Sequence, residues 1–349
     1  MNYGRSGRAR YPYTGHRKAI IKIPNWIAIF ALAVTFVTGG AVVQAQQKQK
    51  VSRLGYLTTN SAAAEKPRLV PFLQGLRARG HVEGQNLAIE YRFTDGKFER
   101  LPELAAELVR LNVDVLIANS TNAALAAQNA TRTIPIFFMG VTDPIGAGLI
   151  DSLARPGGNI TGLTNIASVL SGKRLELLKE TVAKLSRVAV LWDPKNPGST
   201  PQWNESQLAA RELGLHVHSM AVSVVDKYES AFKDAVKARS AALAVTQNPL
   251  ANSNQKLVID LAAKYRLPAI YGRSDFVENG GLMSYAQSWE QDGRDAARLV
   301  DKLLKGAKPE EIPTEQPMTF EFVVNLIAAK QIGLTIPPNV LVRSQRVIR

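Results

Sequence analysis

Short apolar runs alternate along the chain with longer stretches in which apolar residues recur every three or four positions. Apolar runs bounded by Gly, Pro or polar turn residues predict strands, and the repeat of three to four predicts amphipathic helices. The predicted strands cover residues 53–57, 87–93, 113–118, 134–139, 160–163, 188–192, 216–222, 241–246, 268–271, 282–285 and 320–324. The predicted helices cover residues 66–79, 98–111, 123–130, 172–185, 201–213, 228–238, 252–265, 290–305 and 326–332. Residues 337–349 are expected to form a tail.

This alternation predicts an α/β fold, with parallel strands joined by crossover helices. The strands are too many for one compact sheet, and the pattern restarts after Asn165. We therefore predict two doubly wound parallel-sheet lobes with a ligand cleft between them. A TIM barrel is the alternative, since eight βα units can be drawn along the chain.

Three connectors have the character of crossings between lobes, at residues 163–171, 284–289 and 306–319. They assign residues 51–165 and 286–314 to lobe 1. Residues 166–285 and 315–349 then form lobe 2.

The stretch Thr133–Gly162 contains one complete strand–helix–strand unit in this pattern. Its polar turn at Thr142–Pro144 is expected to cap a short helix on which Gly146 and Gly148 lie. Open α/β sheets bind their ligands at such turns, beyond the carboxyl ends of the strands.

The first 45 residues have the three parts of a secretory signal peptide. A basic segment is followed by the apolar run Trp26–Val37 and by small or apolar residues up to Ala45, after which cleavage is expected. An uncleaved anchor is the alternative, because Trp26–Gln47 carries no charge and could span a bilayer. Either reading places the folded part outside the cytoplasm, and we predict a periplasmic protein.

Composition excludes several classes of site. The chain of 349 residues has no cysteine, which rules out disulfides, a thiol nucleophile and a lipid attached to an N-terminal Cys. Its formal net charge of +14 includes six basic residues and no acidic residue before Ala45. The other charges are scattered without a basic block, so we expect no nucleic-acid partner.

Catalytic signatures are missing as well. The sequence has no Gly-x-Ser-x-Gly elbow, P-loop, Gly-x-Gly-x-x-Gly after a strand, or His-Glu-x-x-His. We therefore predict a protein that is not an enzyme and that uses no cofactor and no metal. A monomer is expected.

Short polar side chains gather where the predicted strands end. Such groups can satisfy the donors and acceptors of a small polar ligand once water is excluded. The predicted ligand-binding residues are Thr58, Asn60, Ser120, Thr121, Asn122, Asp143, Asp193, Asn196, Gln247, Asn248 and Asp275. Each of these residue types is also a common helix cap or turn former, so the set is stronger evidence than any single member.

This set contains candidate partners for the carboxylate and the ammonium group of a zwitterionic ligand. Residues 119–122 lie at a predicted helix N-terminus, where free N–H groups and the helix dipole favour a carboxylate. An ammonium group needs an anion, and Asp275 is preferred because Asp143 and Asp193 each precede Pro in a common turn. Five aromatic residues near strand ends could form an apolar wall, although core packing is their commoner role: Tyr56, Phe138, Trp192, Tyr271 and Phe276.

The segment TDPIGAGLIDSLARPGGNITGLTN at residues 142–165 resembles the signature of a family of ABC transporter substrate-binding proteins. Further segments that fit the same family lie at residues 69–96, 101–118, 187–199, 267–285 and 320–341. The family has the type I periplasmic-binding fold and includes members that bind tryptophan and other aromatic amino acids. The resemblance implies two lobes joined by three crossings, with the ligand carboxylate at Ser120 and Thr121 and the ammonium at Asp275. Many members carry Gly-Thr-Pro where this chain has Asn119–Asn122, so its ligand can differ from theirs.

These observations predict the extracytoplasmic solute-binding component of an ABC importer. It would capture a small polar ligand by hinge closure, with an amino acid, aromatic or branched, as the best candidate, and deliver it to a membrane permease. The alternatives are a ligand-sensing protein that presents its ligand to a receptor and an α/β enzyme acting on a small metabolite. A transcription regulator's effector domain shares this fold, but the signal peptide argues against it.

Overall fold

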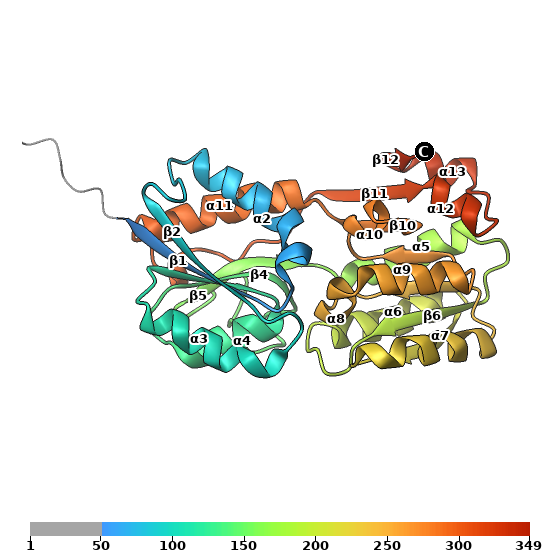
Figure 1. Cartoon of the computed structure of the whole chain (residues 1–349), viewed down its shortest axis with the longest axis horizontal. Helices are drawn as coiled ribbons and strands as arrows, with labels where there is room; N and C mark the ends of the chain where they lie inside the picture. Colours follow the sequence, from blue (N-terminus) through green and yellow to red (C-terminus); the bar gives the residue numbers. More distant parts are fainter. Residues whose placement is uncertain (1–50) are drawn as a thin grey trace, which may run out of the picture. The chain divides into compact units, whose positions relative to one another are not determined.

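The computed structural model describes residues 51–349, which form two sheets with helices on both faces of each (Figure 1). The predicted signal peptide lies outside these residues. No helix among the described residues has the length and apolar character needed to cross a membrane.

The first lobe is built on a five-stranded, fully parallel sheet with the order β2-β1-β3-β4-β5. Its strands are β1 (Ser52–Thr58), β2 (Leu87–Phe93), β3 (Val115–Asn119), β4 (Ile136–Thr142) and β5 (Ile160–Asn165). Its helices are α2 (Ala62–Arg77), α3 (Leu101–Arg110), α4 (Thr121–Ala130) and, from much later in the chain, α11 (Trp289–Leu304). The short 3-10 segments η1 (Phe98–Arg100) and η3 (Pro309–Glu311) complete it.

Alternate residues of each central strand face opposite layers of this lobe. On β3, Leu116 packs with α3 and α4, whereas Val115 and Ile117 pack with α2 and α11. Helices α2 and α11 approach each other closely because Gly75 and Gly293 face the contact. A Cβ atom at Gly75 would lie 2.7 Å from the Cβ of Ala297. The apolar side chains on both faces of β3 and the glycines of α2 and α11 together explain why α11 packs in the first lobe, although it begins only at Trp289.

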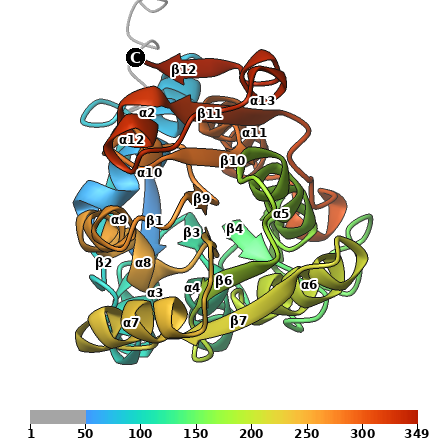
Figure 2. The ribbon, with the colours of Figure 1, turned by 90° about the vertical axis from the view of Figure 1, so that its right-hand side faces the viewer.

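The second lobe is built on a seven-stranded sheet with the order β12-β11-β10-β9-β8-β6-β7. Its strands are β6 (Arg187–Trp192), β7 (His216–Ala221), β8 (Ala242–Val245), β9 (Ala269–Tyr271), β10 (Met283–Gln287), β11 (Phe320–Asn325) and β12 (Arg346–Ile348). Its helices are α5 (Val169–Thr181), α6 (Thr200–Glu212), α7 (Tyr228–Lys237), α8 (Pro249–Ser253), α9 (Gln255–Lys264), α10 (Asp275–Glu278), α12 (Leu326–Gln331) and α13 (Pro338–Val342), with η2 at Val225–Lys227. Helices α5 and α6 cover one face, and α7 and α9 cover the other (Figure 2).

Three sequence predictions are wrong in detail. Strand β11 runs antiparallel to β10, although all other pairs in this sheet are parallel. The predicted tail instead forms α13 and β12, which pairs with β11. The short helix expected after Thr142 is a series of turns. Asp143 Oδ1 accepts a hydrogen bond from Gly146 N, as a helix cap does, but Gly148 has a φ of 70°, which does not continue a helix.

Among the described residues the chain passes between the lobes three times, after β5, after β10 and before β11. Two separate sheets exclude the TIM barrel. The buried Arg174 links the first two passages, donating from Nη1 to the Ala167 carbonyl and from Nε to the Tyr285 carbonyl. Burial lowers the pKa of Arg174 to about 10. The exact lobe boundaries drawn from the sequence stay predictions.

Candidate functional site

The carboxyl ends of the first-lobe strands meet at one edge of the sheet. The register pairs Thr58 with Asn119, and Thr142 with Asn165. Thr142 Oγ1 donates to Asn165 Oδ1, and Asn165 Nδ2 donates to the Gly140 carbonyl. Because parallel strands all end on the same side, residues that are far apart in sequence form one polar surface.

The strand ends of the second lobe form a matching polar surface. Ser199 Oγ lies 3.0 Å from Thr246 Oγ1, which joins the loops after β6 and β8. Gln202 binds both backbone groups of Gln247, since its Nε2 donates to the carbonyl and its Oε1 accepts from the N–H. Gln247 Nε2 in turn donates to the Gly272 carbonyl in the loop after β9. These contacts hold the three loops together.

A small cavity of about 40 Å³ lies between the two polar surfaces. Its lining comes from both lobes and consists of Thr59, Asn60, Arg68, Asn119, Ser120, Thr121, Gly140, Thr142, Asn165, Asn196, Gly198, Gln247, Asn248, Pro249, Asn252 and Arg273. A buried water occupies roughly 10–15 Å³ on this measure, so the space equals about three waters. A ligand larger than that requires the lobes or the side chains to move.

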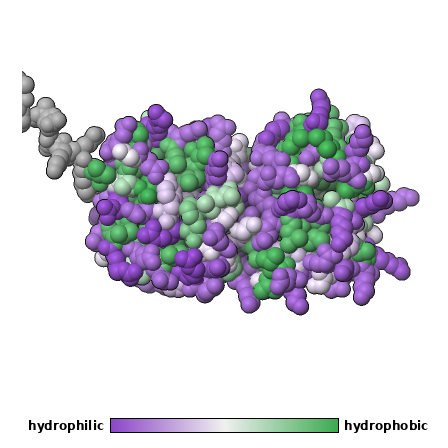
Figure 3. All heavy atoms as spheres, viewed as in Figure 1, coloured by the Kyte–Doolittle hydropathy of each residue, from purple (hydrophilic) through white to green (hydrophobic). Residues whose placement is uncertain are grey.

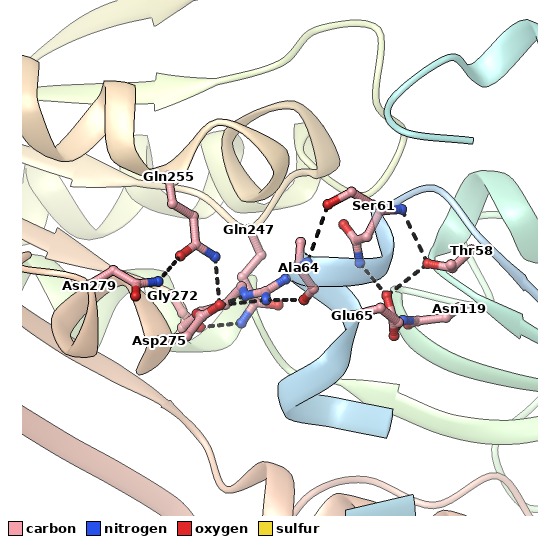
Figure 4. Close-up of polar contacts among 12 residues, drawn as sticks. Thr58, Ser61, Ala64, Glu65, Asn119, Gln247, Gln255, Gly272, Asp275 and Asn279 are labelled. Carbon is pink, nitrogen blue, oxygen red and sulfur yellow. Dashed lines mark hydrogen bonds and ion pairs between the residues drawn. The ribbon is translucent and has the colours of Figure 1, made fainter. Parts of the chain in front are cut away.

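A buried carboxylate organises the first-lobe half of the cavity. Glu65 is 1% exposed and accepts hydrogen bonds from Tyr56, Thr58, Asn60 and Asn119. Figure 4 shows Thr58 and Asn119 beside it. Burial and the Glu65 carboxylate raise the pKa of the Tyr56 hydroxyl well above its ordinary value, so Tyr56 stays a donor. A carboxylate accepts only, so the amides of Asn60 and Asn119 must turn their nitrogens towards Glu65. Their oxygens therefore point elsewhere.

Arg68 continues this network from the same helix. Its Nη1 donates to Asn119 Oδ1, and its guanidinium carbon lies 5.5 Å from the centre of the Trp289 ring. Gly140, with a φ of 61°, leaves room for it, since a Cβ there would lie 2.7 Å from Arg68 Nη1. The network thus places a buried guanidinium at the edge of the cavity.

Helix α4 begins at the cavity with a strained N-cap. Ser120 has φ 113° and ψ 160°, a region that residues other than glycine rarely occupy, and its Oγ accepts from Ala123 N. The N–H groups of Thr121 and Asn122, in the first turn, have no acceptor within the helix. They and the helix dipole suit a carboxylate.

The lobes touch directly at two places beside the cavity. A Cβ at Gly198 in the second lobe would lie 3.0 Å from Thr121 Oγ1 and 3.4 Å from Thr142 Oγ1 in the first. Arg273 Nη2 donates to the Ala64 carbonyl across the cleft. The Arg273 guanidinium also lies 4.4 Å from the centre of the Trp289 ring.

Six of the residues predicted from sequence line the cavity together: Asn60, Ser120, Thr121, Asn196, Gln247 and Asn248. Thr58 lies one layer behind, bound to Glu65. Asn122 and Asp193 are outside the lining, and Asp193 Oδ1 accepts from Lys195 N and Ser223 Oγ. Asp143 is exposed in its turn.

Asp275 also lies outside the cavity lining, and its carboxylate is already engaged. It forms a buried ion pair with Arg273, with Oδ2 2.7 Å from Nη2, and accepts from Gln255 Nε2 (Figure 4). A ligand ammonium in the cavity would therefore not meet a free carboxylate at Asp275. The candidate aromatic wall is likewise absent from the lining, because Tyr56, Phe138, Tyr271 and Phe276 are core residues.

The described residues contain no group of three or more His, Asp and Glu side chains placed to hold a metal. The cavity offers amide, hydroxyl, guanidinium and backbone groups, which bind and orient a small polar molecule. Residues 66–348 match the family of ABC transporter substrate-binding proteins. The chain belongs to this family.

Relatives of this substrate-binding protein include a tyrosine-binding protein of Clostridioides difficile (strain R20291). The two are 27% identical over 313 residues, which cover 87% of this chain and 90% of the relative. A solved ABC domain from Streptococcus pneumoniae in complex with L-Trp is 26% identical, with a TM-score of 0.79, covering 85% of this chain and 99% of that one. A ligand-free, open substrate-binding protein from Clostridium difficile is 25% identical, with a TM-score of 0.63, covering 86% of this chain and 99% of that one.

The two solved structures have nearly the same identity and coverage but different TM-scores. This substrate-binding protein superposes better on the ligand-bound structure than on the open one. The contact of Gly198 with Thr121 and the Arg273–Ala64 hydrogen bond agree with that comparison. In this structure the two lobes are therefore in direct contact beside the cavity.

Sequence reasoning missed the charged residues of the site, Glu65, Arg68 and Arg273. A signal for the first two was present. Glu65 and Arg68 precede Phe72 and Leu76 at helical spacing, so they continue the buried face of α2. Charged residues on a buried helix face need partners, which points to a polar network or a binding site.

Proposed function

We propose that this substrate-binding protein captures an amino acid outside the cytoplasm and passes it to the membrane permease of an ABC importer. The observation that carries the proposal is the polar cavity formed by strand ends of both lobes, with a free helix N-terminus on one side. The named ligands of two relatives, tyrosine and L-Trp, support an amino acid. The predicted signal peptide supports a place outside the cytoplasm.

Capture proceeds by closure of the lobes around the ligand. An open form binds the ligand on one polar surface, and closure brings the second surface onto it while water leaves. The hydrogen bond from Arg273 to Ala64 and the Gly198 contact then join the lobes. No bond of the ligand is made or broken, since the cavity serves recognition alone.

The test is ligand-induced stabilisation across all the standard amino acids. A ligand that binds only the folded state stabilises it by about 2.7 kcal/mol at 100 times its Kd, which raises Tm by several degrees. The ligand should then be recovered unchanged by mass spectrometry after denaturation. The proposal fails if no amino acid raises Tm, or if the bound amino acid is converted to another compound.

A further inference from the structure

The charged side chains that line the cavity itself are cationic. The lining includes two arginines, Arg68 and Arg273, and no Asp or Glu. Asp275 neutralises Arg273 through a buried ion pair. Arg68 is 8% exposed and forms no ion pair within residues 51–349. Its Nη1 donates to the Asn119 amide oxygen, the Asn119 nitrogen donates to Glu65, and the Asp292 carboxyl lies near the guanidinium. The Arg68 guanidinium thus lines the cavity without a direct ion pair.

Arg68 and the first turn of α4 are two separate anion-binding features of the same lobe. Asn119 links them, because it accepts from Arg68 and directly precedes the cap residue Ser120. A single carboxylate needs only one of them. A ligand with two carboxylates can use the helix N–H groups for one and the guanidinium for the other.

The cavity also has acceptors for an ammonium group. Thr59 Oγ1 and Asn60 Oδ1 are buried and lack hydrogen-bond partners in the described part of the chain. The orientation of Asn60 follows from its Nδ2, which donates to Glu65 at 2.7 Å and leaves Oδ1 as a free acceptor. The negative charge of Glu65 behind Asn60 adds attraction for a cation.

The polar character of the lining argues against a large apolar side chain. None of the lining residues is aromatic, and Pro249 is its largest apolar side chain. An indole or phenol ring would lie against amides and hydroxyls that need polar partners, and burying such groups unpaired is costly. A compact ligand that is polar throughout fits this lining better.

We propose that the ligand is a compact amino acid with a second carboxylate, of the aspartate or glutamate kind. One carboxylate binds the first turn of α4, the other binds Arg68, and the ammonium binds Thr59 and Asn60. This inference rests on the proposed function and narrows it to acidic amino acids.

The wild-type protein tests this directly by calorimetric titration at neutral pH. Aspartate or glutamate should bind about tenfold or more tightly than asparagine, glutamine, tyrosine or tryptophan, and also about tenfold tighter than succinate or glutarate, which lack the ammonium. Tighter binding of tyrosine or tryptophan, or equal binding of the amides, overturns the inference and leaves amino-acid capture intact. Equal binding of the diacids overturns the ammonium site. If no amino acid binds, the proposed function itself fails.

Variants at Arg68 test the assignment of the second carboxylate. Arg68→Gln should reduce the ratio of glutamate to glutamine affinity about tenfold, and Arg68→Lys should restore part of it. Arg77→Gln is the matched control, because it removes the same charge from the exposed side of the same helix. A purely structural Arg68 would weaken both ligands equally, and that result would contradict the assignment.

Discussion

Arg273 Nη2 donates a 2.8 Å hydrogen bond to the carbonyl oxygen of Ala64, and this bond joins the two lobes. Arg273 lies in the loop after β9, and Ala64 lies in the first turn of α2. Asp275 fixes the guanidinium from behind, at 2.7 Å from Nη2. The geometry requires that the lobes be close together, so the bond contributes only to the closed state.

We predict that Arg273→Lys shifts the protein towards its open form. Lysine keeps a positive charge for Asp275. It lacks the planar guanidinium group with which arginine binds Asp275 and Ala64 at the same time. The loss of one buried hydrogen bond should weaken ligand affinity about threefold to tenfold. Calorimetric titration measures the affinity, and small-angle X-ray scattering should show a larger radius of gyration without ligand.

The control for this variant is Arg187→Lys. Arg187 Nη1 also donates to a backbone carbonyl, that of Ala238, but both residues belong to the second lobe. It should leave affinity and radius of gyration unchanged. If both variants behave alike, the bond from Arg273 to Ala64 has no special role in closure.

We predict that Gly198→Ala opposes closure by a steric contact between the lobes. The added Cβ would lie 3.0 Å from Thr121 Oγ1, which is tighter than ordinary contact. Separation of the lobes would remove this contact. Affinity should fall several-fold while the stability of the ligand-free protein holds or rises, because alanine restricts the unfolded chain. Titration and thermal unfolding without ligand measure the two effects.

Gly172→Ala provides the comparison. Its Cβ would lie 3.2 Å from the Cβ of Ala209, a similar crowding between α5 and α6 within one lobe. This variant should alter stability and leave affinity alone. Equal affinities of Gly198→Ala and the wild type would contradict the closed contact.

The fold was largely predictable from the sequence. The spacing of apolar residues indicates whether a segment is a helix or a strand, and which of its sides is buried. On β3, the side chains that alternate between the two layers are all apolar, as expected for a buried parallel strand. The turn after Thr142 was not predictable in the same way. Asp143 accepts from Gly146 N as a helix cap would, but Gly148 takes a left-handed conformation that ends the turn.

The site was predictable only in part. The strand ends could be listed from sequence, but which of them face the cavity depends on lobe closure. Asp275 was the preferred ammonium partner, yet it pairs with Arg273 only two residues away. Glu65 and Arg68 lie on the buried face of α2, and their partner Asn119 comes 54 and 51 residues later. Such long-range pairing leaves no mark in local patterns. On the face shown in Figure 3, apolar residues lie in separate patches among polar ones.

We predict opposite stability effects for two changes at Ser120. Ser120→Gly should relieve the strain of φ 113°, worth about 1–3 kcal/mol, at a cost of a few tenths for the cap. Ser120→Ala should keep the strain and lose the Oγ bond to Ala123 N, costing about 1 kcal/mol. Chemical denaturation measures both free energies of unfolding. Equal destabilisation by the two variants would show that the backbone at residue 120 is not strained.

We predict that Asp292 makes the protein less stable as the pH rises towards neutral. Asp292 is 3% exposed, and burial raises the pKa of its carboxyl from 3.8 to about 7, although the nearby Arg68 opposes this shift. The folded protein therefore keeps a proton that the unfolded chain releases at lower pH. The stabilisation from this proton is complete below about pH 4 and is lost as the pH rises through about 7.

Asp292→Asn isolates this effect, because the amide mimics the protonated acid and does not titrate. Between about pH 5 and pH 8 the variant should gain on the order of 2–3 kcal/mol in unfolding free energy relative to wild type. Denaturant unfolding of both proteins at several pH values measures the difference in their unfolding free energies. The contributions of all other titrating groups are the same in both proteins and cancel in this difference. A carboxylate paired with Arg68 would instead have a lowered pKa, and the wild type would then gain on the variant as the pH rises. The sign of the change with pH in this stability difference therefore decides between two arrangements. Either Asp292 is ionised and paired with Arg68, or Asp292 is protonated and Arg68 is available to an anionic ligand.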